Sequence, residues 1–368
     1  MCLRARTDRL EGEAMQEFVY TAQSVRVVFG VDAWSRLNAE AGLLGAGKAL
    51  VLCTPRQRAL AQRALDALAQ RGAGIYDKAA MHVPLATVQD AGIAARQMET
   101  DCIVAIGGGS TIGLAKALAL ESALPILAVP TTYSGSEMTS IYGVTEDGQK
   151  KTGKDDRVLP RTVIYDPALT LKLPLGISVA SGLNAMAHAA EGLYARDGNP
   201  VLALMAEEGI RAMAGGLRRL ARRGDDADAR SESLYGAWLC GTVLGGAGMA
   251  LHHKLCHTLG GSFDLPHAQT HSVVLPHAMA YNAAAASPAM QRISRALDRP
   301  GLPAAEALHD LAQELGAPLA LRDIGMRETD LDRAADIASS KPYWNPRPID
   351  RDGIRALLQR AFEGARPA

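Results

Sequence analysis

Residues 101–120 read DCIVAIGGGSTIGLAKALAL, and this stretch decides the fold. The apolar run at 102–106 is typical of a buried parallel strand, and the residues after the glycines have the composition of a helix. Gly107, Gly108 and Gly109 join the two elements. Glycines let the backbone approach a diphosphate, and a helix N-terminus offers unpaired N–H groups to its charge. A glycine triplet alone is often only a tight turn, but its place between strand and helix favours a nucleotide site.

The residues on either side of this stretch have two different patterns. Up to about residue 170, short β-branched runs alternate with helical patterns, which indicates βαβ crossovers and a mostly parallel sheet with helices on both faces. Beyond that point apolar residues recur at spacings of three and four, which indicates helices. The strands are expected at 26–30, 48–53, 102–106, 125–132 and 162–167, and the long helical segments of the second half at 181–192, 199–223, 231–261, 303–316 and 353–365.

A chain of 368 residues suits two domains. We expect a Rossmann-like, dinucleotide-binding α/β domain at 15–168 and an all-helical catalytic domain at 169–368. Met15 is the more usual start, so residues 1–14 are expected to be a disordered extension. Ligands of such proteins usually bind between the domains.

The composition excludes several classes of function. Lys and Arg number 39, as do Asp and Glu, so there is no net charge to attract nucleic acid or an acidic membrane. The five cysteines include no CxxC pair, so a disulfide framework or a structural zinc site is not expected. The charged first residues and the interrupted apolar runs lead us to expect neither a signal peptide nor a membrane-spanning segment. We expect a cytoplasmic protein that binds a small molecule.

A second polar loop, VPTTYSGSEMTS at 129–140, follows the next expected strand. By itself it could be a hydroxyl-rich surface turn, but two such loops at the carboxyl ends of neighbouring strands favour a cofactor site. The basic segment 148–161 is interpreted as a solvated hairpin from which one cation could reach the cofactor. The candidate cofactor contacts are Gly107, Gly108, Gly109, Ser110, Thr131, Thr132, Ser136, Thr139, Thr54 and Lys151.

Six of the nine histidines lie between residues 252 and 277. His253 and His257 are four apart on an expected helix, and His267 begins the next segment. His188 and Asn184 are likewise four apart at 181–192, on one helical face. One such pair is often a coincidence of packing, but several pairs in a chain with a nucleotide loop favour a catalytic cluster.

Four motifs in this order resemble the group III, iron-type alcohol dehydrogenase family: GGGS before a helix, PTT with SGSE, GLN with AHA and E, and HKLCHTLGG. The resemblance extends over essentially the whole chain from Met15. It implies the dehydroquinate synthase-like fold of that family, with NADH or NADPH as cofactor. It also implies that the family's metal ligands, one Asp and three His, fall on Asn184, His188, His253 and His267, with His257 beside the nicotinamide.

Two residues depart from the family pattern. Asn184 stands where the family has its ligand Asp, and Gly113 stands where an Asp usually follows the GGGS motif. Together with PYWNPRPI at 342–349, these departures resemble the branch that reduces 2-maleylacetate to 3-oxoadipate in aromatic degradation. That branch implies a homodimer, and chlorinated maleylacetates are further candidate substrates. Thr54-Pro55-Arg56 leaves the cofactor open, with NADH favoured over NADPH.

The amide removes the one anionic ligand, so affinity for a divalent metal such as iron, zinc or manganese should fall. In a conjugated ketone the hydride adds to the carbon β to the carbonyl, and charge builds on the enolate oxygen. A metal could stabilise this charge, but we favour imidazolium and ammonium donors. His188, His253 and His267 are the expected donors, and His253 or His257 the proton donor to the α-carbon. Alternatively, Asn184 only caps or packs within its helix.

A dicarboxylate substrate requires cations beside the histidines. Lys254 and Arg347 are the candidates, with Tyr343 as a hydroxyl partner, and these three could equally be solvated surface groups. Asn184 is expected to be a neutral neighbour of the substrate. Two other functions stay open. One is a metal-dependent alcohol or lactaldehyde-type dehydrogenase of the same family, and the other is a nucleotide-binding pseudoenzyme.

Overall fold

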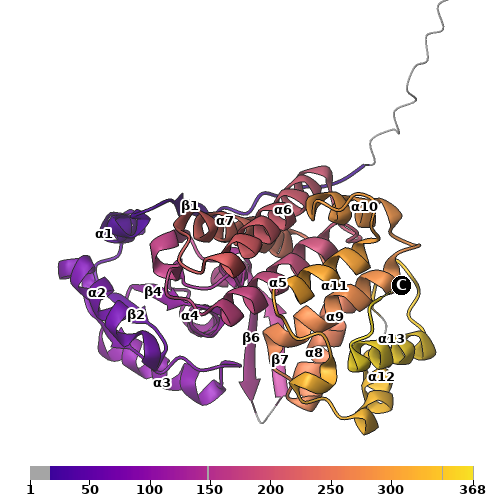
Figure 1. The fold of residues 1–368 in the computed structure, drawn as a ribbon. Coiled ribbons are helices and arrows are strands. Elements are labelled where there is room, and N and C mark those ends of the chain that lie inside the picture. Colours follow the sequence, from indigo (N-terminus) through magenta and orange to yellow (C-terminus); the bar gives the residue numbers. More distant parts are fainter. Residues whose placement is uncertain (1–16, 147–148, 342, 368) are drawn as a thin grey trace, which may run out of the picture.

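The computed structural model describes residues 17–146, 149–341 and 343–367. The expected extension at 1–14 lies outside the described residues. In Figure 1 the strand-and-helix part is drawn in indigo to magenta, and the helical part runs from magenta and pink (α5, α6 and α7) to orange and yellow.

The first half forms a six-stranded sheet, as the sequence predicts. Its strands are β1 (Arg26–Phe29), β2 (Ala49–Leu52), β3 (Gly72–Tyr76), β4 (Cys102–Gly107), β5 (Ile126–Pro130) and β8 (Thr162–Tyr165). Their order is β1-β8-β5-β4-β2-β3, and every pair is parallel. The sequence did not predict β3, because the glycines of GAGIY are unfavourable in strands. Since β5, β4 and β2 are neighbours, their carboxyl ends lie side by side.

Helices cover both faces of this sheet. They are α1 (Leu37–Leu43), α2 (Arg58–Leu68), α3 (Leu85–Gln97) and α4 (Gly109–Ser122). Alternate strand residues point to opposite faces: Val51 and Val104 pack in the cluster with α1 and α2, whereas Leu50 and Ile103 pack with α3 and α4. The central strands β2, β4 and β5 therefore lack charged residues, because both of their faces are buried.

A separate antiparallel hairpin follows β5. It is formed by β6 (Ile141–Glu146) and β7 (Gln149–Lys154). The expected hairpin at 148–161 is thus shifted, because the basic residues supply only its second strand and the β-branched segment before them supplies the first. The chain then makes a short turn at 156–158 and enters β8.

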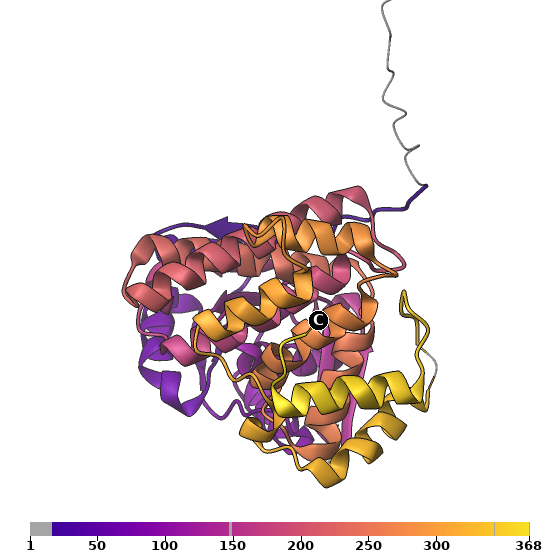
Figure 2. The same ribbon diagram turned by 45° about the vertical axis from the view of Figure 1, so that its right-hand side comes forward.

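The second half is helical, as expected (Figure 2). Its helices are α5 (Leu175–Gly192), α6 (Pro200–Arg222), α7 (Ala227–Gly246), α8 (Leu251–Phe263), α9 (His267–Asn282), α10 (Ser287–Ala296), α11 (Ala304–Glu314), α12 (Leu331–Ser339) and α13 (Arg351–Glu363). The expected helical segment 231–261 is two helices, α7 and α8, bent by 96°. Gly245, Gly246 and Gly248 flank the break, where glycine's conformational freedom weakens a helix.

Two smaller expectations concern the cysteines and the membrane. Cys53, Cys102, Cys240 and Cys256 are buried free thiols, which confirms the expected lack of disulfides within the described residues. No single helix in the described ranges is long and apolar enough to cross a membrane, and only the bent pair α7 and α8 has the length and composition together.

Candidate active site

The glycine loop lies at the carboxyl end of β4, as predicted. Gly107 has a φ of +154°, and a Cβ on Gly108 would lie 2.7 Å from the hydroxyl oxygen of Thr132. A Cβ on Gly109, the first residue of α4, would meet nothing within 4 Å. The loop is thus packed on one side and open at its helix end, which is the arrangement a phosphate needs. Ser110 follows in the first turn of α4 and is partly exposed.

Gln57 joins the ends of the three neighbouring strands, and the sequence analysis missed it. Its Nε2 donates to the hydroxyl of Thr131 at 2.8 Å, and the hydroxyl of Thr54 donates to its Oε1 at 3.2 Å. The same Oε1 lies close to Gly107, where a Cβ would approach it to 2.8 Å. Gln57 therefore fixes the geometry of three predicted cofactor contacts. No motif marks it, because its role depends on the strand order.

The second polar loop, at 129–140, is held by hydrogen bonds from a buried lysine. Lys116 donates to the backbone oxygen of Ser136 at 2.6 Å, to the hydroxyl of Thr139 at 2.8 Å and to the backbone oxygen of Ile141 at 2.9 Å. Burial lowers the pKa of Lys116 to about 7, although Glu137 acts in the opposite direction. The hydroxyl of Thr139 is buried and accepts from Lys116, so this residue also supports the loop, and its contact with the cofactor stays a prediction.

This loop also reaches the helical half. Gly135 has a φ of +76°, and a Cβ there would lie 2.9 Å from Cα of Gly241 in α7 and 3.5 Å from Nδ1 of His188. The nucleotide side of the protein therefore meets the histidines at Gly135. Lys151, the remaining predicted cofactor contact, lies on β7 and forms an ion pair with Glu146.

The predicted histidines do come together, from three helices. Asn184 and His188 lie on α5, His253 and His257 on α8, and His267 begins α9. The ring centroids of His188 and His253 are 5.0 Å apart, those of His253 and His257 6.3 Å, and those of His257 and His267 6.4 Å. Asn184, His188 and His253 are buried, whereas His257 and His267 are exposed. The cluster thus extends from the core to the surface.

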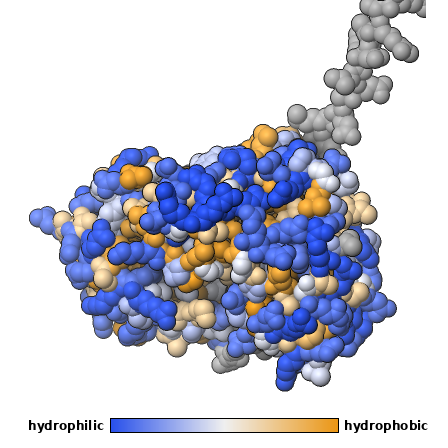
Figure 3. All heavy atoms as spheres, viewed as in Figure 1, coloured by the Kyte–Doolittle hydropathy of each residue, from blue (hydrophilic) through white to orange (hydrophobic). Residues whose placement is uncertain are grey.

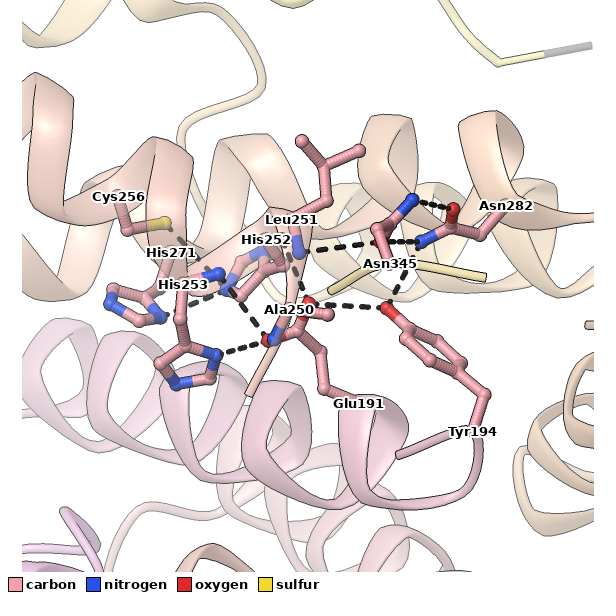
Figure 4. A network of polar contacts seen from close by, with 10 residues as sticks. All are labelled: Glu191, Tyr194, Ala250, Leu251, His252, His253, Cys256, His271, Asn282 and Asn345. Carbon is pink, nitrogen blue, oxygen red and sulfur yellow. Dashed lines mark hydrogen bonds and ion pairs between the residues drawn. The ribbon is translucent and has the colours of Figure 1, made fainter. Parts of the chain in front are cut away.

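Glu191 of α5 orients His253 (Figure 4). Its carboxylate lies 2.6 Å from Nδ1 of His253 and accepts backbone N–H bonds from Ala250 at 3.0 Å and His252 at 2.8 Å, and the hydroxyl of Tyr194 at 3.2 Å. Burial acts to raise the pKa of Glu191, but these bonds and the nearby histidines lower it to about 2. Because the ionised carboxylate only accepts, Nδ1 of His253 donates to it. The GLN–AHA–E motif contains this acid, but its partner could not be read from the sequence.

Two further histidines belong to the cluster, although the predicted site omitted them. His252 and His271 are fully buried, and Nε2 of His252 lies 2.9 Å from Nδ1 of His271. The His271 ring centroid is 5.1 Å from that of His253 and 4.5 Å from that of His267. By contrast, His277 is buried beside His309, outside this cluster.

The expected substrate anchors differ in their surroundings. The ammonium of Lys254 lies 5.8 Å from the ring centroid of Tyr343, whose hydroxyl is buried without a partner among the described residues. The guanidinium of Arg347 lies 3.9 Å over the ring of Tyr281 and forms an ion pair with Asp350 at 3.7 Å. Lys254 and Tyr343 thus form a pair, whereas the contacts of Arg347 do not support its expected role.

On the face shown in Figure 3, hydrophilic residues cover most of the surface and apolar ones gather near its middle.

The site fits a divalent cation in the kind of donor it offers. Oδ1 of Asn184, Nδ1 of His188 and Nε2 of His253 are buried polar atoms without a hydrogen-bond partner among the described residues. Imidazole nitrogens and an amide oxygen are ligands for zinc, iron and manganese. The set lacks an anionic ligand, and burial together with the neighbouring histidines lowers the pKa of His188 well below its usual value. His188 is therefore a neutral imidazole, not the imidazolium that the sequence analysis expected.

Comparisons with known proteins cover nearly the whole chain. The family model described as "Iron-containing alcohol dehydrogenase" matches residues 24–167, and that described as "Fe-containing alcohol dehydrogenase family, C-terminal" matches 178–362. A maleylacetate reductase of Burkholderia cepacia is 56% identical over 354 residues, which are 96% of this chain and 100% of the relative.

Solved structures give the same picture. The crystal structure of a maleylacetate reductase from Agrobacterium tumefaciens is 51% identical, with a TM-score of 0.93 over 96% of this chain and 100% of the other. An iron-containing alcohol dehydrogenase from Corynebacterium glutamicum is 41% identical, with a TM-score of 0.92 over 96% and 99% of the two chains. The expected α/β and helical architecture is thus confirmed.

Proposed function

This chain belongs to the iron-containing alcohol dehydrogenase family, and from that premise we propose that it is an oxidoreductase that reduces 2-maleylacetate to 3-oxoadipate with NADH or NADPH. The observation that carries the proposal is the similarity, over nearly its full length, to relatives named maleylacetate reductase. The presence of Asn184 in place of an acid fits a dianionic substrate, because a carboxylate there would repel it.

The two loops would hold the cofactor. Gly108 and Gly109 would receive its diphosphate, because backbone N–H groups lie at the start of α4 and a Cβ at Gly109 would meet nothing within 4 Å. Gly135 would lie beside its nicotinamide, because this residue is close to His188. When bound, the cofactor would supply the hydride.

Lys254 and Tyr343 bind a substrate carboxylate. The ammonium gives an ion pair and the hydroxyl, which has no other partner among the described residues, gives a hydrogen bond. The hydride then adds to the double-bond carbon β to the ketone, and a proton to the α-carbon completes the reduction. His253, whose ring Glu191 holds through Nδ1, is one candidate to deliver this proton, and exposed His257 is the second. His188, buried and neutral, serves as a polar neighbour.

A divalent cation at this site would be held by Asn184, His188, His253 and His267, and it would act as a Lewis acid on the ketone oxygen. We propose that turnover does not require it. The donor set has no anionic ligand, and donors from Lys254 and the histidines can meet the charge that develops on the substrate.

The test is oxidation of NADH by the purified protein with maleylacetate and, in parallel, with a simple aldehyde, each with and without chelator. We expect turnover of maleylacetate only, unchanged by the chelator. Turnover of the aldehyde alone, abolished by chelator, would show the alternative function, that of a metal-dependent alcohol dehydrogenase. Loss of maleylacetate turnover in chelator, restored by one metal, would overturn the metal-free proposal alone.

The anchor is tested by Lys254→Met and Tyr343→Phe. Uniform binding should be lost, so KM for maleylacetate should rise about tenfold or more while kcat changes little. Arg347→Met distinguishes the two candidate cations, and we expect its KM to stay near that of the wild type. The reverse order of effects would make Arg347 the anchor and remove Lys254.

A further inference from the structure

Lys116 links the two loops that we assign to the cofactor. It belongs to α4, the helix that begins at Gly109, and its side chain is fully buried. Its ammonium lies at the end of the second loop, where it donates to the backbone oxygens of Ser136 and Ile141 and to the hydroxyl of Thr139. The reaction as proposed above makes no use of this group.

The ammonium form of Lys116 satisfies all of these oxygens. An ammonium has three N–H groups, and each of them has an acceptor here, at 2.6, 2.8 and 2.9 Å. The hydroxyl of Thr139 is fully used as well, since it accepts from the backbone N–H of Ile141 and donates to the backbone oxygen of Ser136, both at 3.3 Å. Residues 136–141 are therefore bound around the ammonium as one unit.

The counter-charge of this ammonium is a second buried group, Glu137. Its carboxylate is fully buried and accepts from the hydroxyl of Tyr165 on β8 at 2.8 Å. Burial lowers the pKa of Lys116, and the charge of Glu137 acts in the opposite direction. The ammonium is thus bound by neutral oxygens of the loop, while an acid of the same loop compensates its charge.

Helix α7 also contacts this loop. A Cβ on Gly241 would lie 2.7 Å from the backbone oxygen of Gly135 and 2.8 Å from its Cα. A Cβ on Gly245, one turn further along α7, would overlap the backbone oxygen of Met138. Loop and helix therefore meet backbone to backbone, an approach that only glycine permits. Gly135 cannot move toward α7, and the residues after it are bound to α4.

We propose that Lys116 is a positioning residue for hydride transfer. By binding residues 136–141 it keeps Gly135 against α7, at the place where a Cβ on Gly135 would lie 3.5 Å from Nδ1 of His188. Since Gly135 would lie beside the nicotinamide, its position would set how the hydride donor meets a substrate held on the histidine side. The inference rests on the proposed function. The helix that would receive the diphosphate thus also fixes the place of the nicotinamide.

The experiment measures hydride transfer in Lys116→Met in a single turnover. Methionine keeps an unbranched apolar chain but has no N–H group. Oxidation of bound NADH by excess maleylacetate is followed by stopped flow, and NADH deuterated at C4 identifies the phase in which the C–H bond breaks. We expect the rate constant of this phase to fall about tenfold, because small displacements of reacting groups slow a reaction strongly. The Kd for NADH, from fluorescence titration, should stay within about threefold, since the diphosphate site is unchanged.

Glu40→Gln is the matched control, because it removes another fully buried charge. Glu40 pairs with Arg26 at 2.7 Å and with Arg36 at 3.1 Å. Arg26 begins β1 at the amino ends of the strands, away from both loops. The rate constant of this variant should equal that of the wild type. A loss of folded protein lowers the amplitude of a single turnover but not its rate constant, so a purely structural role of Lys116 would leave the rate constant unchanged.

An unchanged rate constant in Lys116→Met, or a slowing that Glu40→Gln shares, would overturn the proposal. So would a loss confined to the Kd for NADH. If the wild type itself does not reduce maleylacetate, it is the proposed function that fails, and hydrogen exchange then decides whether Lys116 holds the loop.

Hydrogen exchange tests the wild-type protein, and it applies even if Lys116→Met does not fold. The backbone N–H groups of Met138 and Thr139 donate within this loop, at 3.1 and 3.3 Å. Because Lys116 holds these turns without a ligand, the segment 134–141 should exchange as slowly without NADH as with it. Rapid exchange that slows only when NADH is added would overturn the proposal, since the cofactor would then order the loop.

Discussion

The nucleotide side and the histidine side of this site satisfy their polar groups in different ways. At the carboxyl end of the sheet the contacts come from backbone and short side chains, and Gln57 ties them together with ordinary hydrogen bonds. Among the histidines, Nδ1 of His188 and Nε2 of His253 are buried without a described partner, while Glu191 is surrounded by donors. On the nucleotide side these side chains are thus hydrogen-bonded to one another, whereas on the histidine side several buried polar atoms have no described partner. Unpaired buried groups are expected where a ligand completes the site.

Among the variants considered, Glu191→Gln is expected to have the largest effect, and it acts on the histidine side. An amide keeps the shape but loses the charge that fixes His253, so we expect activity to fall about 10- to 100-fold and stability by about 1.5–3 kcal/mol. Steady-state kinetics and urea unfolding measure the two effects. Thr170→Ser, at another fully buried polar position, is the control for disturbing the core. If Glu191→Gln keeps full activity, the carboxylate has only a packing role.

The decrease in the free energy of unfolding at low pH tests the same carboxylate. The pKa of Glu191 is lowered from 4.5 to about 2 on folding. Its charge therefore stabilises the fold above about pH 4.5, and this contribution is lost as the pH falls toward 2. Glu191→Gln should lose less stability than the wild type over that interval. Equal slopes would show that Glu191 does not carry the effect.

The same contrast explains what the sequence could predict. The strand–glycine–helix pattern at 101–120 and the alternating apolar runs are local, so the sheet and its phosphate loop followed from them. His188, His253 and His267 were recognised by type and spacing. The partners of those groups were missed, because Gln57, Glu191 and the His252–His271 bond depend on contacts between distant elements. The bond between the hydroxyl of Thr139 and Lys116 could not be predicted either, because it also joins a loop to a distant helix.

Asn184→Asp tests the histidine side separately, because it adds a negative charge there and leaves the nucleotide side unchanged. An anionic ligand beside His188 should raise the affinity for zinc about tenfold, since carboxylate ligands favour divalent cations. In the absence of metal it should lower kcat/KM for maleylacetate about tenfold, a change of ~1.4 kcal/mol that reflects repulsion of the dianion. Calorimetric titration with zinc and kinetics in chelator measure the two effects. Unchanged zinc affinity would show that residue 184 does not face the cation.

Gly109→Ala tests the nucleotide side separately, and we expect it to have the smallest effect of these variants. A Cβ at Gly109 meets nothing within 4 Å, so the unfolding free energy should stay within about 0.5 kcal/mol of the wild type. The methyl group would, however, stand where the diphosphate approaches the backbone, so KM for NADH should rise about fivefold, or ~1 kcal/mol, with kcat nearly constant. Gly261→Ala, on α8 and equally open, is the matched control and should leave KM unchanged. If Gly109→Ala binds NADH as the wild type does, the open end of the loop is not the phosphate site.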